Sequence, residues 1–171
     1  MNWREVLDRM ALLARLAAFD VRVAGTFPLG IDVPGSDIDL LCHAPDSHRF
    51  AQAVWDACAD YPEFAIYQWT YEDRPVVAGF VLHHIPFEIF GQAIPVSKQH
   101  GWRHFEVERR LLALGGDALR EAVMAARMAG MKTEPAFAQV LGLEGDAYEA
   151  LLELSKLDDQ ALRAVLPERM K

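Results

Sequence analysis

Two aspartates separated by one residue carry the strongest chemical signal in this sequence. Asp37 and Asp39 lie in the run Asp-Ile-Asp-Leu-Leu-Cys over 37–42, whose alternation predicts a β-strand. Side chains two positions apart in a strand project from the same face, so the two carboxylates would repel each other unless a cation joins them. Hard oxygen ligands of this kind suit Mg²⁺, which takes its remaining ligands from water and substrate phosphates. We therefore interpret Asp37 and Asp39 as ligands of Mg²⁺ or Mn²⁺.

A loop rich in glycine and proline comes just before this pair. Residues 25–36 contain three glycines and two prolines, which predicts a shaped loop without a helix. Gly25 lets the backbone approach a phosphate closely, and Thr26 offers a hydroxyl and an N–H beside it. Ser36, directly before the first aspartate, is a further candidate for nucleotide binding.

A third acid interrupts an apolar strand later in the chain. Glu88 lies in the run Ile-Pro-Phe-Glu-Ile-Phe over 85–90, and a buried glutamate is costly unless it is paired or binds a metal. If this strand lies beside that of the aspartates, Glu88 could come within about 5 Å of them. Three acids so placed could hold two Mg²⁺ ions for an in-line phosphoryl displacement. The alternatives are turn-forming aspartates at a strand start, and a Glu88 that faces solvent or pairs with an arginine.

The elements that would position these residues follow from hydrophobic periodicity. Helices are expected over 3–19 and 47–60, and strands over 21–24, 37–42, 64–71, 76–83 and 87–90. After Pro95 the pattern is helical, with breaks at Gly115-Gly116, at Gly130, over 142–145 and near Leu157, and with Thr133 and Asp146 as N-caps. This order predicts an α+β (mixed α/β) fold, with a mixed sheet flanked by helices over 1–94 and a helical region over 95–171 packed on or beside it.

The charge composition limits the kinds of molecule that the protein is expected to bind. The 171 residues include 17 Lys and Arg against 25 Asp and Glu, a formal net charge of −8. This balance argues against broad binding to nucleic acid, but it permits a nucleotide held through a metal. Cys42 and Cys58 are expected to be buried thiols. Without a signal-peptide pattern or an apolar run of about 18 residues, we expect a cytoplasmic protein with no membrane partner.

The pattern as a whole resembles the nucleotidyltransferase superfamily that includes DNA polymerase beta. That superfamily is recognised by an apolar residue and Gly-Ser or Gly-Gly, a spacer of about ten residues, and then Asp-apolar-Asp-apolar, with a later apolar-acid-apolar strand. Here Ala24-Gly25-Thr26, ten residues and Asp37-Ile38-Asp39-Leu40 match the first part, and Phe87-Glu88-Ile89 matches the last. Thr in place of Ser and Glu in place of the commoner Asp are the departures. The motif covers residues 20–91.

A narrower resemblance covers most of the chain, to a bacterial family within this superfamily that is catalogued as a domain of unknown function. It is carried by Gly30-Ile31-Asp32-Val33-Pro34-Gly35-Ser36-Asp37, Glu88-Ile89-Phe90-Gly91-Gln92, Arg103-His104 and Lys132-Thr133-Glu134-Pro135-Ala136-Phe137. The superfamily resemblance implies that Asp37 and Asp39 bind metal, and that Glu88 is the third acid and could be the base. It also implies that Gly25 and Thr26 hold a triphosphate. The narrower likeness favours Arg103 and Lys132 as phosphate or acceptor contacts.

The activity implied is a magnesium-dependent nucleotidyltransferase. It would move a nucleoside monophosphate from a triphosphate such as ATP to a small molecule or a protein. One alternative is a nucleotide-binding or protein-interaction module on the same fold without turnover. Another is a metal-dependent phosphohydrolase that releases phosphate in place of pyrophosphate. The base, the acceptor and the oligomeric state stay open at this point.

Overall fold

The computed structural model describes residues 3–71 and 73–170, which form two compact units. The first unit comprises Met1–Pro28 and Pro34–Gln99, and the second comprises Leu29–Val33 and His100–Lys171. The first unit therefore contains the three predicted acids and the Gly-Thr pair. The second unit is helical.

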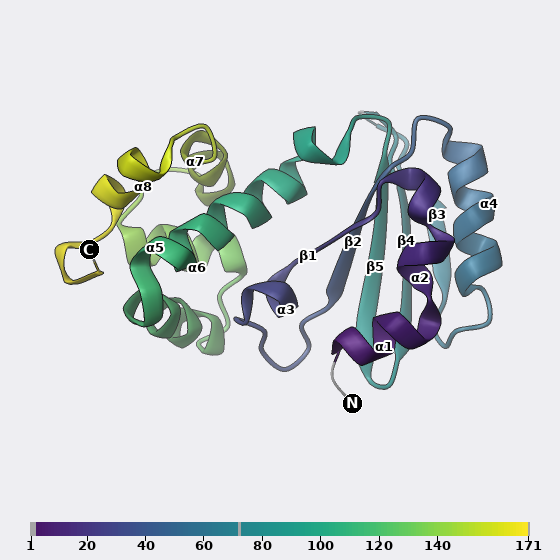
Figure 1. Cartoon of the computed structure of the whole chain (residues 1–171), viewed down its shortest axis with the longest axis horizontal. Helices are drawn as coiled ribbons and strands as arrows, with labels where there is room; N and C mark the ends of the chain where they lie inside the picture. Colours follow the sequence, from purple (N-terminus) through teal and green to yellow (C-terminus); the bar gives the residue numbers. More distant parts are fainter. Residues whose placement is uncertain (1–2, 72, 171) are drawn as a thin grey trace. The chain divides into compact units, whose positions relative to one another are not determined.

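A five-stranded mixed sheet is the framework of the first unit (Figure 1). Its order is β1-β2-β5-β4-β3, where β1 is Arg22–Ala24, β2 is Ile38–His43, β3 is Ala65–Gln68, β4 is Val76–Leu82 and β5 is Ile85–Gln92. Only β2 and β5 pair in parallel, and the other three pairings are antiparallel. The mixed α/β fold predicted from the element order is confirmed.

Helices cover one face of this sheet, which we call the core face (Figure 1). They are α1 (Trp3–Met10), α2 (Leu12–Arg15) and α4 (Ser47–Cys58), with the 3₁₀ turn η1 (Ala17–Phe19) after α2. Ile38 and Leu40 of β2 and Ile89 of β5 are fully buried there together with Phe50 of α4. Because side chains alternate along a strand, the residues between them project from the opposite face.

The two cysteines belong to the core, as predicted. Both are free and buried. Burial is the main cause that raises the pKa of Cys42 to about 12 and that of Cys58 to about 11. Neither thiol is therefore poised to act as a nucleophile at neutral pH.

The single helix predicted over 3–19 is wrong in its continuity. Ala11 adopts a left-handed conformation with φ of 48°, which ends α1 and starts α2. The break rotates the chain so that Leu12 and Leu16 are buried, whereas an unbroken helix would have turned Leu13 and Ala17 inward. The free energy gained by burying these two leucines therefore exceeds the cost of interrupting the helix.

The loop predicted over 25–36 contains a short helix that the sequence analysis excluded. This helix, α3, spans Thr26–Leu29 and includes Pro28. Proline is compatible with the first turn of a helix, where the backbone N–H has no intrahelical acceptor. Glycine and proline therefore bound the turn without preventing it.

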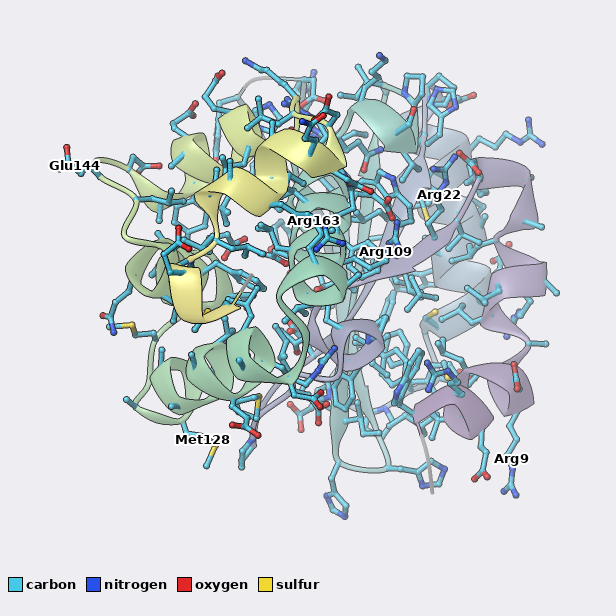
Figure 2. The ribbon with its side chains drawn as sticks, turned by 60° about the vertical axis from the view of Figure 1, so that its left-hand side comes forward. Arg9, Arg22, Arg109, Met128, Glu144 and Arg163 are labelled. Atoms are coloured by element: carbon cyan, nitrogen blue, oxygen red, sulfur yellow. The ribbon has the colours of Figure 1, made fainter. Side chains whose placement is uncertain are left out.

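The second unit contains four helices after the 3₁₀ turn η2 (Val96–Lys98), which itself belongs to the first unit. They are α5 (His100–Met128), α6 (Thr133–Leu141), α7 (Ala147–Leu154) and α8 (Asp159–Val165), followed by the 3₁₀ turn η3 (Glu168–Met170). The break predicted at Gly115-Gly116 is confirmed as a kink, since Gly116 has φ of 58° within α5. Met128, which ends α5 and is labelled in Figure 2, is 65% exposed.

The helix caps of this unit match the prediction at one of two positions. Asp146 caps α7 by accepting a hydrogen bond from the Glu149 N–H at 3.0 Å. Thr133 is wrong as a cap, because it is the first residue of α6 and Lys132 holds the cap position without a side-chain bond. Among the described residues, none of the helices is both long and apolar enough to span a bilayer.

The short segment Leu29–Val33 belongs to the second unit because α5 holds it. Arg120 of α5 donates hydrogen bonds to the carbonyl oxygens of Leu29 and Gly30, the latter at 3.2 Å. Ile31 within the segment is fully buried. The loop between Thr26 and Asp37 is thus fixed at its middle by a side chain from α5.

Candidate active site

Asp39 and Glu88 face each other across the one parallel pairing of the sheet. The register of β2 and β5 makes them direct Cα partners. Because the core face takes Ile38, Leu40 and Ile89, both carboxylates project from the opposite face, which we call the acidic face. The strand adjacency on which the prediction for Glu88 depended is confirmed.

Gly25 lies against the carboxylate of Asp39 from the other side. It follows β1 directly, and the last residue of β1, Ala24, is the Cα partner of Asp39. A Cβ at Gly25 would overlap Oδ2 of Asp39 and lie 3.1 Å from its Cγ. Gly25 also has φ of 80°, a region that side chains disfavour. Only glycine fits here, because the aspartate occupies the space that a side chain would need.

Asp37 lies one residue before β2, so the strand begins one residue later than predicted. Its side chain is exposed, and its charge acts on Glu88. The pKa of Glu88 is raised, first because the surrounding strands desolvate its carboxyl and second because of the negative charge of Asp37. Glu88 is nevertheless exposed, so it faces solvent on the acidic face. The two acids are therefore electrostatically coupled, as like charges in one site are.

Thr26 and Ser36 are both buried at the two ends of the loop. The Thr26 hydroxyl is enclosed and has no hydrogen-bond partner among the described residues. A buried hydroxyl without a partner costs free energy, so an unsatisfied one beside a carboxylate site calls for a functional explanation. A phosphate oxygen bound at this loop would supply the missing acceptor.

A divalent metal is the cofactor that the fold family implies, and the donor set fits it chemically. Asp37, Asp39 and Glu88 supply carboxylate oxygens, the ligands that Mg²⁺ prefers. Over residues 3–71 and 73–170, no three acidic, imidazole or thiol side chains are gathered tightly enough to form a ready metal cluster. The negative charge of Asp37 raises the pKa of Glu88, and a bound cation would relieve this repulsion.

The two basic residues predicted to contact phosphate belong to the second unit. Arg103 of α5 donates hydrogen bonds to the Leu152 carbonyl oxygen at 2.9 Å and to the Ser155 hydroxyl at 2.7 Å. These bonds cap the last turn of α7, which is a structural role. Lys132 precedes α6 and is exposed. Their role in binding nucleotide stays a prediction.

Gly79 and Ala65, which were not predicted as site residues, continue the row of Cα partners that contains Asp39 and Glu88, which we call the acidic row. Ala24, Asp39, Glu88, Gly79 and Ala65 are successive Cα partners across all five strands. Gly79 lies in the middle of β4, and a glycine within an apolar strand often marks a place where a ligand or another backbone approaches. That signal was available in the sequence.

A cavity of about 280 Å³ in the first unit lies away from these carboxylates. It begins where β2 and β5 end, and it is lined by Ala44, Pro45, Ser47, Gln68, Asp73, Arg74, Gly91 and Ala93. The acids instead occupy the exposed surface of the sheet. We place the candidate site at the three acids because their carboxylates can bind a metal, although they do not line the cavity.

Solved structures similar to this chain define the class of fold. One is a chain of the GLD-2/RNP-8 complex, with a TM-score of 0.53 and 12% identity over 81% of this chain. Another is the Cid1 poly(U) polymerase bound to MgGTP, with a TM-score of 0.53 and 15% identity over 72% of this chain. The chain spans 55% of the first structure and 40% of the second. Together with the acidic row, these likenesses identify a nucleotidyltransferase fold.

The family follows from the sequence itself. The chain belongs to the family described as Domain of unknown function (DUF4269), which matches residues 5–154. No curated protein matches the chain in sequence. The family match includes the sheet with all three acids and extends through α6 to the end of α7.

Proposed function

We propose that this protein is a metal-dependent nucleotidyltransferase that transfers a nucleoside monophosphate from a nucleoside triphosphate to an acceptor hydroxyl. The observation that carries the proposal is the fit of Gly25 against Asp39, with Glu88 as the next Cα partner. In this proposal the Gly25-Thr26 loop binds phosphate, Asp39 binds metal, and Glu88 on the neighbouring strand is the base. The superfamily resemblance and the fold of the similar structures support the same reaction.

Different residues of the chain have different roles in this reaction. Gly25 and Thr26 bind the triphosphate through the backbone and the unpartnered hydroxyl. Glu88, on the strand beside Asp39, takes the proton of the acceptor hydroxyl. The acceptor oxygen forms a bond to the α-phosphorus, the bond from that phosphorus to the bridging oxygen breaks, and pyrophosphate leaves.

Asp37, Asp39 and Glu88 are the residues that would hold Mg²⁺ or Mn²⁺. When bound, such ions neutralise charge on the phosphates and stabilise the transition state of an in-line displacement.

The acceptor is a small molecule or a protein side chain in this proposal. The net charge of −8 disfavours a long nucleic acid as acceptor, because phosphate backbones need a cationic surface. The similar poly(U) polymerase is described as selective for UTP and was solved with MgGTP, which supports a ribonucleoside triphosphate as donor.

The test follows ³¹P NMR spectra of the protein with ATP, GTP, CTP or UTP and Mg²⁺, with and without a pool of small hydroxyl compounds. We expect one nucleotide to give pyrophosphate and a new phosphodiester resonance. Asp39→Asn should lower the rate by about 100-fold or more, as the loss of a preorganised electrostatic group does. Glu106→Gln, at an exposed ion pair with Arg109 in α5, is the matched control and should leave the rate unchanged.

Three results would contradict the proposal. Release of inorganic phosphate in place of pyrophosphate would indicate a phosphohydrolase. Nucleotide binding without any product from the acceptor pool would favour a binding module. Equal rates for the wild type and Asp39→Asn would remove the acids from the reaction.

A further inference from the structure

Gly79 is a glycine that the fold does not need. It lies inside β4, between its Cα partners Glu88 on β5 and Ala65 on β3. Its φ is outside the left-handed region, and a Cβ there would have as its nearest neighbour the Phe87 carbonyl oxygen at an ordinary 3.6 Å. Gly91 on β5 differs, because a Cβ at that position would lie 2.6 Å from a ring carbon of Phe50.

A glycine in a strand interior weakens the strand, since most other residues pair and pack better there. Neither backbone conformation nor packing explains Gly79. Because Gly79 has no side chain, the surface of the sheet directly beside Glu88 is low. Ala65, the next residue in the row, is exposed and also small. The acidic face thus continues from Glu88 to the sheet edge as a floor of two small residues.

Aromatic side chains border this floor on one side. The neighbouring row of Cα partners runs from Phe90 through Val77 to Tyr67, which is 54% exposed. The ring of Trp69 packs edge-on against Phe90, with centroids 5.8 Å apart. Trp69 also stacks on Tyr71 at 5.0 Å, and Tyr71 is 58% exposed. Aromatic rings next to a low floor, two of them exposed, make a surface suited to a flat ring.

The order of the strands fixes the side of the reaction to which this surface belongs. The Gly25-Thr26 loop follows β1, at one edge of the sheet, and the acids lie on β2 and β5 in the middle. Gly79 and Ala65 lie on β4 and β3, on the far side of Glu88 from the phosphate loop. Adjacent strands are about 4.8 Å apart, so a group over Gly79 can reach the Glu88 carboxylate.

We propose that Gly79 and Ala65, with the rings of Tyr67, Trp69 and Phe90, form the acceptor site, which takes a hydroxyl compound with a flat aromatic or heteroaromatic ring. This inference rests on the proposed function, because the surface is an acceptor site only if Glu88 beside it takes part in the transfer. The ring lies over Gly79 and Ala65 against the bordering aromatic residues. The hydroxyl then lies next to Glu88 on the neighbouring strand.

The experiment measures saturation-transfer difference NMR on the full chain with 2-phenylethanol at millimolar concentration. 2-Cyclohexylethanol has the same hydroxyl on a ring that is not flat, and it serves as the probe control. Aromatic contacts contribute about 0.5–1.5 kcal/mol beyond buried area, which corresponds to about 2- to 12-fold weaker binding of the saturated ring. We expect the phenyl protons to give the stronger signal.

Variants locate the probe. Gly79→Val raises the floor without a backbone clash and should abolish the phenyl signal. Tyr67→Leu and Trp69→Leu should each weaken binding by about 2- to 12-fold. Trp55→Leu is the matched control, since this indole is 54% exposed on α4 and packs on Phe64 away from the acidic face. Circular dichroism of each variant confirms folding.

Several outcomes would overturn the assignment. These are no phenyl signal with the wild type, equal signals from the two probes, or an undiminished signal in Gly79→Val. Displacement of 2-phenylethanol by saturating Mg-nucleotide would assign the surface to the nucleobase of the donor and would also overturn it. Simultaneous binding of probe and nucleotide supports an acceptor site.

Thermal shifts with Mg-nucleotides on the same samples separate this inference from the proposed function. If no nucleotide binds but the probe responds to the variants as expected, the ring site stands and the transferase proposal fails. If a nucleotide binds and turns over but the probe ignores Gly79→Val, the acceptor site fails and the transferase proposal stands.

Discussion

Glu88 on β5 is the direct Cα partner of Asp39 on β2, in the one parallel pairing of the sheet. Gly25 contacts Asp39 from the side of β1, and Gly79 is the partner of Glu88 on β4. One glycine therefore lies against each acid: Gly25 contacts the side chain of Asp39, and Gly79 is the Cα partner of Glu88. The first is required by the fold because it makes room for Asp39, and the second leaves space that the fold does not use.

Gly25→Ala tests the contact with Asp39. A side chain at φ of 80° costs about 1–2 kcal/mol of stability, and its Cβ must also displace the carboxylate. We expect turnover to fall by about 100-fold, as a misplacement of about 1 Å can cause. Gly35→Ala is the matched control, since Gly35 has φ of 89° and a Cβ there meets nothing within 4 Å. Urea unfolding should show a similar backbone cost in both variants, and equal activities would contradict the role of the contact.

Thr26→Val tests the unpartnered hydroxyl. Valine keeps the shape and removes the buried polar group, so the free energy of unfolding should stay the same or rise by about 1 kcal/mol. Loss of a hydrogen bond to a charged phosphate should weaken nucleotide binding by about 10- to 150-fold, measured by calorimetry. Thr26→Ser retains the hydroxyl and should bind nearly as the wild type does. Unchanged affinity in Thr26→Val would show that this hydroxyl does not meet the nucleotide.

The Glu88 carboxyl should titrate above its ordinary value in a ¹³C NMR pH series. Burial and the charge of Asp37 both raise its pKa, so Asp37→Asn should move the midpoint to lower pH without bringing it fully to the ordinary value. Arg22, labelled in Figure 2, pairs with Asp20 at 2.9 Å, and Asp20→Asn at this pair is the control that should leave the midpoint in place. A Glu88 midpoint at or below the ordinary value would contradict the coupling.

Glu88→Gln should raise the stability of the protein and lower its activity. Because the folded state binds the Glu88 proton more tightly than the unfolded state, the wild type gains stability from this group at low pH and loses it as pH rises through the folded pKa. Glutamine removes the charge, so Tm at neutral pH should rise. Loss of a general base should lower turnover by about 100- to 10,000-fold. A lower Tm at neutral pH would show that the Glu88 charge is stabilised by contacts and not strained.

Gly91→Ala tests the packing under β5. A Cβ there would lie 2.6 and 2.7 Å from ring carbons of Phe50, which is fully buried. Overpacking of this kind costs about 1–3 kcal/mol, measured by urea unfolding. Phe50→Leu in the same chain makes room, so the double variant should be destabilised by less than the sum of the two single changes. Strict additivity would mean that the two residues do not press on each other.

Local chemistry was readable from the sequence because it depends on neighbours along the chain. The alternation over 37–42 predicted a strand, which spans Ile38–His43 in the structure and so begins one residue later than expected. Asp146 was recognised as a cap because its side chain bonds an N–H three residues away. The break at Ala11 was missed because burial of Leu12 and Leu16, a tertiary effect, overrode the helical pattern.

The sequence by itself determined which residues are chemically unusual: the acids, the glycine before Thr26, and a lone glutamate in an apolar strand. The tertiary structure decided which of them meet. Glu88 could face Asp39 only if β5 inserted beside β2 in parallel and in this register, and a shift by one residue would have turned Glu88 into the core. Burial of the apolar residues on the core face fixes that register, and this packing brings together strands that are distant in the chain. The same packing leaves Gly79 beside Glu88.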